Sequence, residues 1–171
     1  MQVILTNMDH YLSNRDHIYG MHIEKISTTD TFLVALKSTH NVYPTTKDVY
    51  TLINTLKKYI AAQGAEITNA PIMNVTQRES ALYELMVAVP TNKALQPSGD
   101  ILYRRMVPGN FMSAEIKGGD ATVKEAMWQM HLFMTDYERT VMAIPYAKLV
   151  TDRSMEPDTS KWVTRIYQPS F

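Results

Sequence analysis

Apolar and polar positions along this chain have strand-like spacing in some stretches and helical spacing in others. These stretches follow one another in the same order in each half. In the first half, two short extended runs, Ile23–Ser27 and Phe32–Ser38, precede a stretch with helical spacing. Two further runs, Pro71–Thr76 and Leu82–Val89, follow it. The helical stretch places apolar residues on one face, at the i, i+3, i+4 and i+7 positions of a buried helix surface: Val49, Leu52, Ile53, Leu56, Tyr59 and Ile60. This half therefore predicts the order β-β-α-β-β.

The ends of this first helix carry local signals of their own. Thr45 stands three residues before Asp48, a weak variant of the capping box that satisfies free backbone N–H groups at a helix start. Gly64 is a plausible end, because glycine adopts the left-handed conformation at little cost.

The second half predicts the same order of elements. Its extended runs are Ile101–Val107, Phe111–Lys117, Tyr146–Val150 and Trp162–Tyr167. Between the second and third runs, Thr122 and Glu125 form a full capping box, so we expect a helix to begin there. Its predicted buried face consists of Val123, Met127, Met130 and Met134.

The two halves also resemble each other residue by residue. Phe32 and Phe111 open similar stretches 79 positions apart, as do Tyr83 and Trp162, and the offset falls to 74 through the predicted helices. Two units of this size are too few for a solenoid, which needs about three or more repeats. We therefore expect one α+β domain over residues 1–171, with repeats over about 23–90 and 101–169. Its duplicated units would be related by a pseudo-twofold axis, with antiparallel sheets, two flanking helices and a central cleft between the repeats.

Composition excludes several classes of function. The 171 residues contain 17 Lys and Arg and 17 Asp and Glu, so the chain has no net charge to support direct nucleic-acid binding. The absence of cysteine excludes disulfides and thiolate metal sites. No segment approaches the roughly 20 apolar residues of a membrane span, and the N-terminus lacks the pattern of a signal peptide. We expect a cytoplasmic protein.

Motifs for catalysis or cofactor binding are missing. There is no Gly-x-Ser-x-Gly elbow and no glycine-rich phosphate loop. His10, His17 and His22 crowd the N-terminus without zinc-like spacing, and we interpret them as part of a solvated segment. His131 lies within the second predicted helix, where it flanks the apolar face. The sequence thus predicts no metal and no cofactor.

Aromatic and charged residues in the closing strands are the better candidates for binding. In Trp162–Tyr167, alternation places Arg165 on the same sheet face as Tyr167. An arginine there is either solvated or in a cleft, where its planar fork could hold an anion or stack on a ring. The candidate ligand-binding residues are Arg165, Tyr167, Tyr146, Trp128, Glu84, Glu115 and Trp162.

Five segments resemble the GyrI-like small-molecule-binding family, and the resemblance covers about residues 23–171. They are the strand-turn-strand of Met106–Gly118, the capped helix Thr122–Tyr137, the segment Pro145–Leu149, the terminal strand Trp162–Pro169 and the strand Leu82–Pro90 that ends the first unit. The superfamily includes the effector-binding domains of AraC-type and MerR-type transcription regulators and the SOUL haem-binding proteins. The resemblance implies two β-α-β-β units with helices that flank an aromatic-lined cleft between two sheets. It also implies a stand-alone form, because too few residues precede Ile23 for a fused DNA-binding module.

The resemblance also bears on the ligand. In many members an acidic residue of the last strand contacts cationic drugs, and Arg165 occupies that position here. This departure implies a neutral or anionic ligand. It also weakens a hydrolase role, for which Glu84 or Glu115 would have to supply the cleft carboxylate.

Three classes of function remain open at this stage. The first is a sensor or sequestering protein for an aromatic or amphipathic small molecule, which we favour over an enzyme. The second is a protein-interaction inhibitor of the kind that binds DNA gyrase, which would need a protein partner. The third is a small hydrolase that uses a cleft carboxylate.

Overall fold

The protein contains the predicted order of elements twice. The computed structural model describes residues 15–29, 31–79, 81–106, 108–141 and 143–170. Its first unit consists of α2 (Arg15–Tyr19), β1 (Glu24–Thr28), β2 (Thr31–His40), α3 (Thr46–Ala62), β3 (Ile72–Glu79) and β4 (Leu82–Thr91). Its second unit consists of β5 (Leu102–Met106), β6 (Gly109–Lys117), α4 (Asp120–Asp136), β7 (Tyr146–Leu149), the short 3₁₀ helix η1 (Thr159–Lys161) and β8 (Val163–Pro169).

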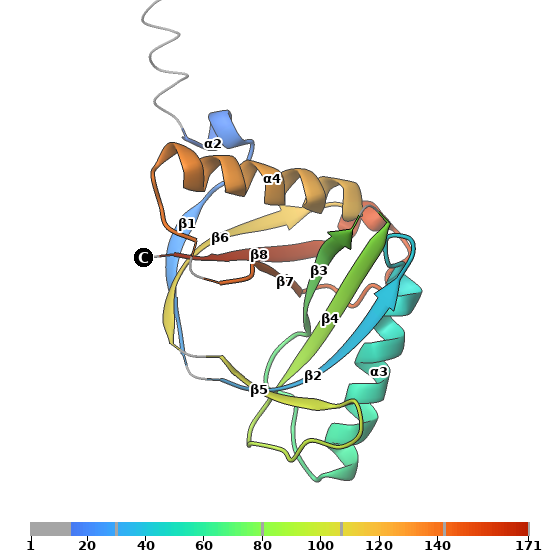
Figure 1. Cartoon of the computed structure of the whole chain (residues 1–171). Coiled ribbons are helices and arrows are strands. Elements are labelled where there is room, and N and C mark those ends of the chain that lie inside the picture. Colours follow the sequence, from blue (N-terminus) through green and yellow to red (C-terminus); the bar gives the residue numbers. More distant parts are fainter. Residues whose placement is uncertain (1–14, 30, 80, 107, 142, 171) are drawn as a thin grey trace, which may run out of the picture.

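The described strands join into a single curled antiparallel sheet (Figure 1). Their order is β1-β6-β8-β7-β3-β4-β2-β5, which reads the same in reverse when the two units are exchanged. The central pair is β3 and β7, in which Met73 lies opposite Ala147, its own counterpart at the offset of 74. The pseudo-twofold axis therefore passes between these two residues, as the duplicated fold class predicts.

The outermost strands are exchanged between the units. β1 pairs with β6 of the second unit, and β5 pairs with β2 of the first. Each unit thus supplies the edge strand of the other half of the sheet.

Strand register corrects the predicted match between Phe32 and Phe111. Leu33 lies opposite Pro90, whereas Phe111 lies opposite Pro169, so the counterpart of Phe111 is Leu33, at an offset of 78. Leu33 and Phe111 are both buried, while Phe32 is half-buried. Because side chains alternate along a strand, a slip of one residue would have placed every side chain of β2 on the wrong face.

The two helix starts differ from each other. In α3, Thr45 and Asp48 form the expected capping box, and Gly64 has the expected positive φ of 58°. The capping box predicted at Thr122 is wrong, because α4 begins at Asp120 and its N-cap is Gly119, three residues before Thr122 and without a side-chain cap. Gly118 has a φ of 138°, and a Cβ there would lie 2.7 Å from the Thr122 hydroxyl oxygen, so this glycine allows the early start.

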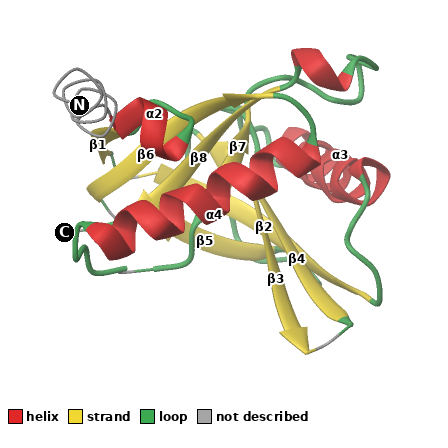
Figure 2. Ribbon diagram, turned by 90° about the horizontal axis from the view of Figure 1, so that it is seen from above, coloured by secondary structure: helices red, strands yellow, loops and turns green. Residues whose placement is uncertain are grey.

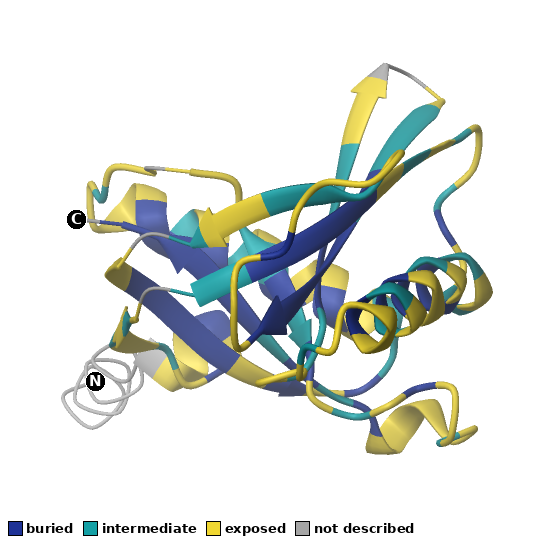
Figure 3. Cartoon of the chain, turned by 90° about the horizontal axis from the view of Figure 1, so that it is seen from below, coloured by how far each residue is buried: buried dark blue, intermediate teal, exposed yellow. Residues whose placement is uncertain are grey.

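Both long helices cover the same face of the sheet (Figure 2). Val49, Ile53, Leu56 and Ile60 of α3 pack on β2, β3 and β4. The core of the second unit lies under α4, with the predicted Val123, Met130 and Met134 joined by Ala126 and Phe133, and Met127 only partly buried. The opposite face is thereby left without a covering helix, and Figure 3 shows buried strand segments on that side. Among the described residues, no helix is both long and apolar enough to cross a bilayer.

The short helix α2 extends the second core. Tyr19 packs edge-on against Phe133, with ring centroids 5.3 Å apart, and its hydroxyl donates to Asp136 at 2.8 Å. Tyr19 and Met21 are buried. The part of the predicted solvated N-terminal segment that the structure describes is therefore anchored on α4, although His17 and His22 themselves are exposed; His10 lies outside the described residues.

Arg153 ties the two units together on the helix-covered side. Its side chain is buried and donates to Asp120 of α4 at 2.6 Å and to Thr164 of β8 at 2.7 Å. Its guanidinium lies 4.6 Å from the ring of Trp162, and its backbone N–H donates to the hydroxyl oxygen of Tyr50 in α3 at 2.6 Å. A buried arginine with this many partners fixes the loop before β8 to both helices.

The core under α3 can be tested at Ile53, which is fully buried. We expect Ile53→Ala to lower the free energy of unfolding by about 2–5 kcal/mol, because it removes buried methyl groups and leaves a cavity. Urea unfolding followed by circular dichroism measures the change. The exposed neighbour Asn54 is the control, and Asn54→Ala should change stability by less than about 0.5 kcal/mol. Equal effects of the two substitutions would contradict the packing of α3 on the sheet.

Candidate functional site: a two-lobed groove

The sheet face without helices carries a groove made of two adjoining hollows. The first, here called the apolar hollow, has a volume of about 600 Å³, and its main lining residues are Ile72, Met86, Ala88, Met106, Phe111, Ile144 and Tyr146. The second, here called the polar hollow, has a volume of about 540 Å³, and its main lining residues are Thr31, Asn69, Thr91, Asn92, Lys148 and Tyr167. Four residues line both hollows and join them into one groove: Leu33, Ile72, Met106 and Tyr146.

The two hollows are counterparts under the pseudo-twofold axis. Lining residues of the apolar hollow come from the β5–β6 corner between Arg104 and Phe111, and those of the polar hollow from the β1–β2 corner between Ile26 and Leu33. The offset of 78 relates these corners residue by residue. The hollows differ in chemistry, because the β1–β2 corner contributes the hydroxyl groups of Ser27, Thr28 and Thr31, whereas the matching positions of the β5–β6 corner are Arg105, Met106 and Gly109.

A cluster of rings forms the junction between the hollows. Tyr146 and Tyr167, opposite each other on β7 and β8, stack with centroids 4.7 Å apart and an interplanar angle of 11°. Phe111 meets both rings edge-on, at 5.8 Å and 6.2 Å. Burial, and to a lesser extent Tyr167, raises the pKa of Tyr146, so its hydroxyl remains a neutral donor and lies 3.6 Å from the Met106 sulfur. The arrangement offers a flat ligand an aromatic wall with one polar group.

A loop before β7 forms one rim of the apolar hollow. The side-chain amide of Asn74 donates to the carbonyl oxygen of Pro145 at 2.8 Å, and its oxygen accepts from Thr76 at 2.8 Å. These bonds hold the rim against β3. Beside Pro145, the side chain of Ile144 lines the hollow yet is 59% exposed.

The described residues that line the groove include cations but no Asp or Glu. Arg104 and Arg105 line the apolar hollow, and Lys148 lines the polar hollow. The predicted carboxylates Glu84 and Glu115 lie on the same sheet face but outside both linings.

Cations neutralise both of these carboxylates. Glu84 accepts from Lys37 at 2.9 Å and from Arg78 at 3.2 Å. Glu115 accepts from Arg165 at 3.0 Å, and this bond raises the pKa of the Arg165 guanidinium. The hydrogen bond from Lys37 contributes most to lowering the pKa of Glu84. General-base catalysis near neutral pH needs the opposite shift.

The seven predicted site residues fall into two groups. Five of them, Tyr146, Tyr167, Arg165, Glu115 and Glu84, lie on the groove face, and only the two tyrosines line the groove itself.

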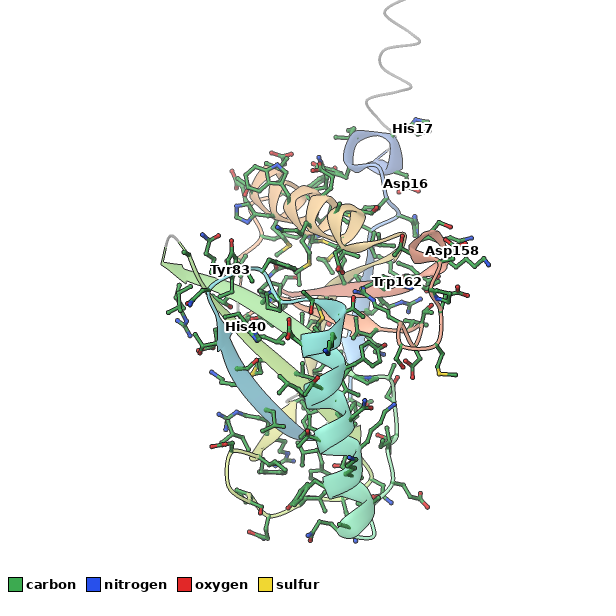
Figure 4. All side chains as sticks on the ribbon, turned by 90° about the vertical axis from the view of Figure 1, so that its right-hand side faces the viewer. Asp16, His17, His40, Tyr83, Asp158 and Trp162 are labelled. Atoms are coloured by element: carbon green, nitrogen blue, oxygen red, sulfur yellow. The ribbon has the colours of Figure 1, made fainter. Side chains whose placement is uncertain are left out.

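The structure places the two tryptophans elsewhere. Trp162 is buried with its ring N–H donating to the carbonyl oxygen of Glu156 at 2.8 Å, and Figure 4 shows it near Asp158 and far from Tyr83. Trp128 is 56% exposed on α4, which covers the other face of the sheet, and its ring lies 5.6 Å from that of His131. Trp128 thus lies away from the groove, and helical spacing alone could not show which face of the sheet its helix covers.

Sequence reasoning missed Arg104, Met106, Phe111 and Lys148 as groove residues. For Lys148 a signal was present, because alternation along Tyr146–Leu149 places it on the same face as Tyr146. For Arg104 and Met106 the signal was hidden, since it depends on the exchange of β5 into the other half of the sheet.

Within the described part of the chain, no group of three or more His, Asp or Glu side chains is arranged to hold a metal ion. His22, for example, contacts a single carboxylate, that of Asp16, at 3.0 Å, and both are solvent-exposed.

No protein-family profile matches the sequence, and no curated protein matches it significantly. Solved structures do resemble it. The EcmrR–DNA complex matches with a TM-score of 0.78 at 12% identity over 98% of this chain, which spans 64% of the length of EcmrR. The EcmrR C-terminal domain matches with a TM-score of 0.75 at 11% identity, over 88% of this chain and 98% of that domain.

Two further structures resemble the chain less closely. SAV2435, bound to tetraphenylphosphonium, matches with a TM-score of 0.55 at 16% identity, over 88% of this chain and 94% of that one. A hydrolase from Listeria innocua matches with a TM-score of 0.64 at 10% identity, over 88% and 92% of the two chains. The chain therefore has the GyrI-like fold of the EcmrR C-terminal domain, as the sequence resemblance implied.

The ion pairs of Glu84 give a testable pH dependence. Because its folded pKa is lowered, its contribution to stability is present above the unfolded value of about 4.3 and is lost as the pH falls through the folded value. Glu84→Gln should therefore be less stable than the unmodified chain at neutral pH, by about 0.2–1 kcal/mol for so exposed a pair. The difference should be smaller at pH 3 than at neutral pH, and it is lost completely only below the folded pKa.

Urea titrations at both pH values measure this difference. The control is Glu125→Gln, since Glu125 accepts from the neutral amide of Gln129 rather than from a cation. A deficit of Glu84→Gln that persists unchanged at low pH would show that its ion pairs are not the cause.

Proposed function

We propose that this protein binds a small aromatic or amphipathic molecule, neutral or anionic, in the groove and acts by sensing or sequestering it. The observation that carries the proposal is the apolar hollow, an open volume of about 600 Å³ beside a ring cluster and an exposed Ile144. Ligand sites are typically concave, mostly apolar and of about 300–1,000 Å³, with a few polar groups that fix orientation. Tyr146 and Asn74 supply such groups here.

The fold comparison supports the same proposal. SAV2435, which shares the fold, is known with tetraphenylphosphonium bound, and EcmrR carries this fold in a protein that binds DNA. A sensing role would require the groove to communicate its occupancy to another domain or protein.

The charges argue against a lipophilic cation such as the one bound to SAV2435. A buried cation needs a carboxylate close by, and Arg165 occupies the position that the family resemblance assigns to one. The predicted carboxylates on the groove face, Glu84 and Glu115, already accept from cations. Binding is favoured over hydrolysis for the same reason, since a cation already pairs with each carboxylate and the pKa of Glu84 is lowered, the opposite of what a general base needs.

Filling the apolar hollow should abolish binding. Met86 lies on the groove face of β4 and is half-buried, so Met86→Trp would place an indole in the space that we assign to the ligand. We expect binding of the neutral fluorescent probe pyrenebutanol to weaken at least about tenfold, a loss of about 1.4 kcal/mol. Fluorescence titration measures the affinity. Met155→Trp is the matched control, because Met155 is 82% exposed outside the groove. Equal binding by both variants would contradict the proposed site.

Two probes of the same shape and opposite charge test the charge preference. Tetraphenylborate and tetraphenylphosphonium differ in the sign of one charge, and the groove-lining cations should favour the anion by at least about tenfold. Isothermal titration calorimetry at low ionic strength compares them directly. Tighter binding of tetraphenylphosphonium would refute a groove selective for neutral and anionic molecules.

A further inference from the structure

We propose that the polar hollow is a carboxylate subsite, so that the groove recognises an amphipathic carboxylate, with the apolar body of the ligand in the apolar hollow and its carboxylate beside Lys148. This inference rests on the proposed function and specifies its ligand class. It is carried by the residues that line the polar hollow and by the order of the strands around it.

Lys148 is a half-buried cation that forms no ion pair with any residue that the structure describes. Its ammonium lies 5.3 Å from the ring centroid of Tyr167. Directly opposite it on β8 is Arg165, another cation. The residue across the ladder therefore does not compensate the charge of Lys148. A ligand anion would supply the missing negative charge.

The nearby carboxylates do not serve Lys148. Glu115 lies 3.0 Å from Arg165, and Glu24 lies 4.0 Å from it. These residues belong to β6 and β1, on the far side of β8 from β7. Their charges therefore offset that of Arg165, and the charged residue nearest to Lys148 in the sheet remains a cation.

Two asparagines add neutral donors to the polar hollow. The side-chain oxygen of Asn69 accepts from the backbone N–H of Ala70 at 2.9 Å, and that of Asn92 accepts from the N–H of Glu66 at 3.1 Å. Because a backbone N–H can only donate, these bonds fix the orientation of both amides. The NH₂ group of each amide is then left to donate to a ligand. A carboxylate, which only accepts, complements this set of donors.

The two hollows are also connected in a way that suits one amphipathic molecule. Leu33, Ile72, Met106 and Tyr146 line both, so an apolar body beside Tyr146 can extend towards Lys148 over a continuous surface. Lys148 lies on β7, beside the pseudo-twofold axis, whereas Arg104 is exposed on the edge strand β5. A half-buried cation is less screened by solvent than an exposed one, which favours Lys148 as the partner of the carboxylate.

Three probes that share a pyrene body test this subsite: pyrenebutyrate, pyrenebutanol and pyrenebutylamine. We expect the unmodified chain to bind the carboxylate about tenfold more tightly than the alcohol, a difference of about 1.4 kcal/mol, because only the carboxylate accepts a charge-assisted hydrogen bond from Lys148. It should bind the amine most weakly. Lys148→Gln should remove the preference for the carboxylate while it leaves the affinity for the alcohol unchanged, which also shows that the variant is folded. Lys58→Gln, at an exposed position of α3, is the charge-matched control and should keep the preference.

Each other outcome separates this inference from the proposed function. If the alcohol binds and Lys148→Gln keeps the preference for the carboxylate, the subsite is wrong and the proposed function stands. The subsite is equally wrong if the unmodified chain shows no preference, or if Arg104→Gln instead of Lys148→Gln removes it, which would place the carboxylate at the rim. If none of the three probes binds to the unmodified chain, both proposals fail.

Discussion

The pairing of β3 with β7 is the constraint on which the rest of the structure depends. Two register pairs join these strands, Ile72 with Lys148 and Met73 with Ala147, whereas seven join β6 and β8. This short ladder lies on the pseudo-twofold axis and makes one sheet of two halves. On one face it closes the core under α3, through Met73 and Ala147; on the other it supplies Ile72 and Lys148 to the groove. Alternate side chains of β3 and β7 thus belong to the core and to the groove.

Side-chain size makes the linings of the two hollows differ. By strand register, Ala88 is the counterpart of Tyr167, and Ile72 that of Tyr146. The second unit thus places large rings where the first unit places small aliphatic side chains, and the symmetric backbone carries an asymmetric surface. The space lies over the small residues, and the rings form its wall. Duplication alone would give two equal hollows; divergence at a few inward-facing positions gives one apolar and one polar hollow.

The sequence was most informative where the signal is local. Helical spacing and capping predicted α3 from Thr45 to Gly64, and alternation predicted the strands of both units in the correct order. The start of α4 could not be predicted from its capping box, because Gly118 permits an earlier turn. The slip of one residue between β2 and β6 was equally hidden. The match of Phe32 with Phe111 suggested an alignment that is wrong by one residue, because the register depends on hydrogen bonds to strands distant in the sequence.

The site was predictable only in part, for a related reason. Tyr146 and Tyr167 line the groove because each lies in a strand whose alternation could be interpreted from the sequence, and the same reasoning would have found Lys148. Whether a strand face meets a helix or the groove depends on the whole sheet. For that reason Trp128 and Trp162, which stand out by residue type, lie away from the groove, while Arg104 reaches it from an exchanged strand.

The exchange of β1 and β5 makes the two units interdependent. An isolated first unit would keep β2, β3 and β4 paired but would have no ladder partner for β1, and its β2 would expose an unpaired edge. A break in the connector between Thr91 and Leu102 would consequently yield two interlocked fragments, each completed by a strand of the other. Integrity of the groove is therefore a property of the paired halves and of neither alone.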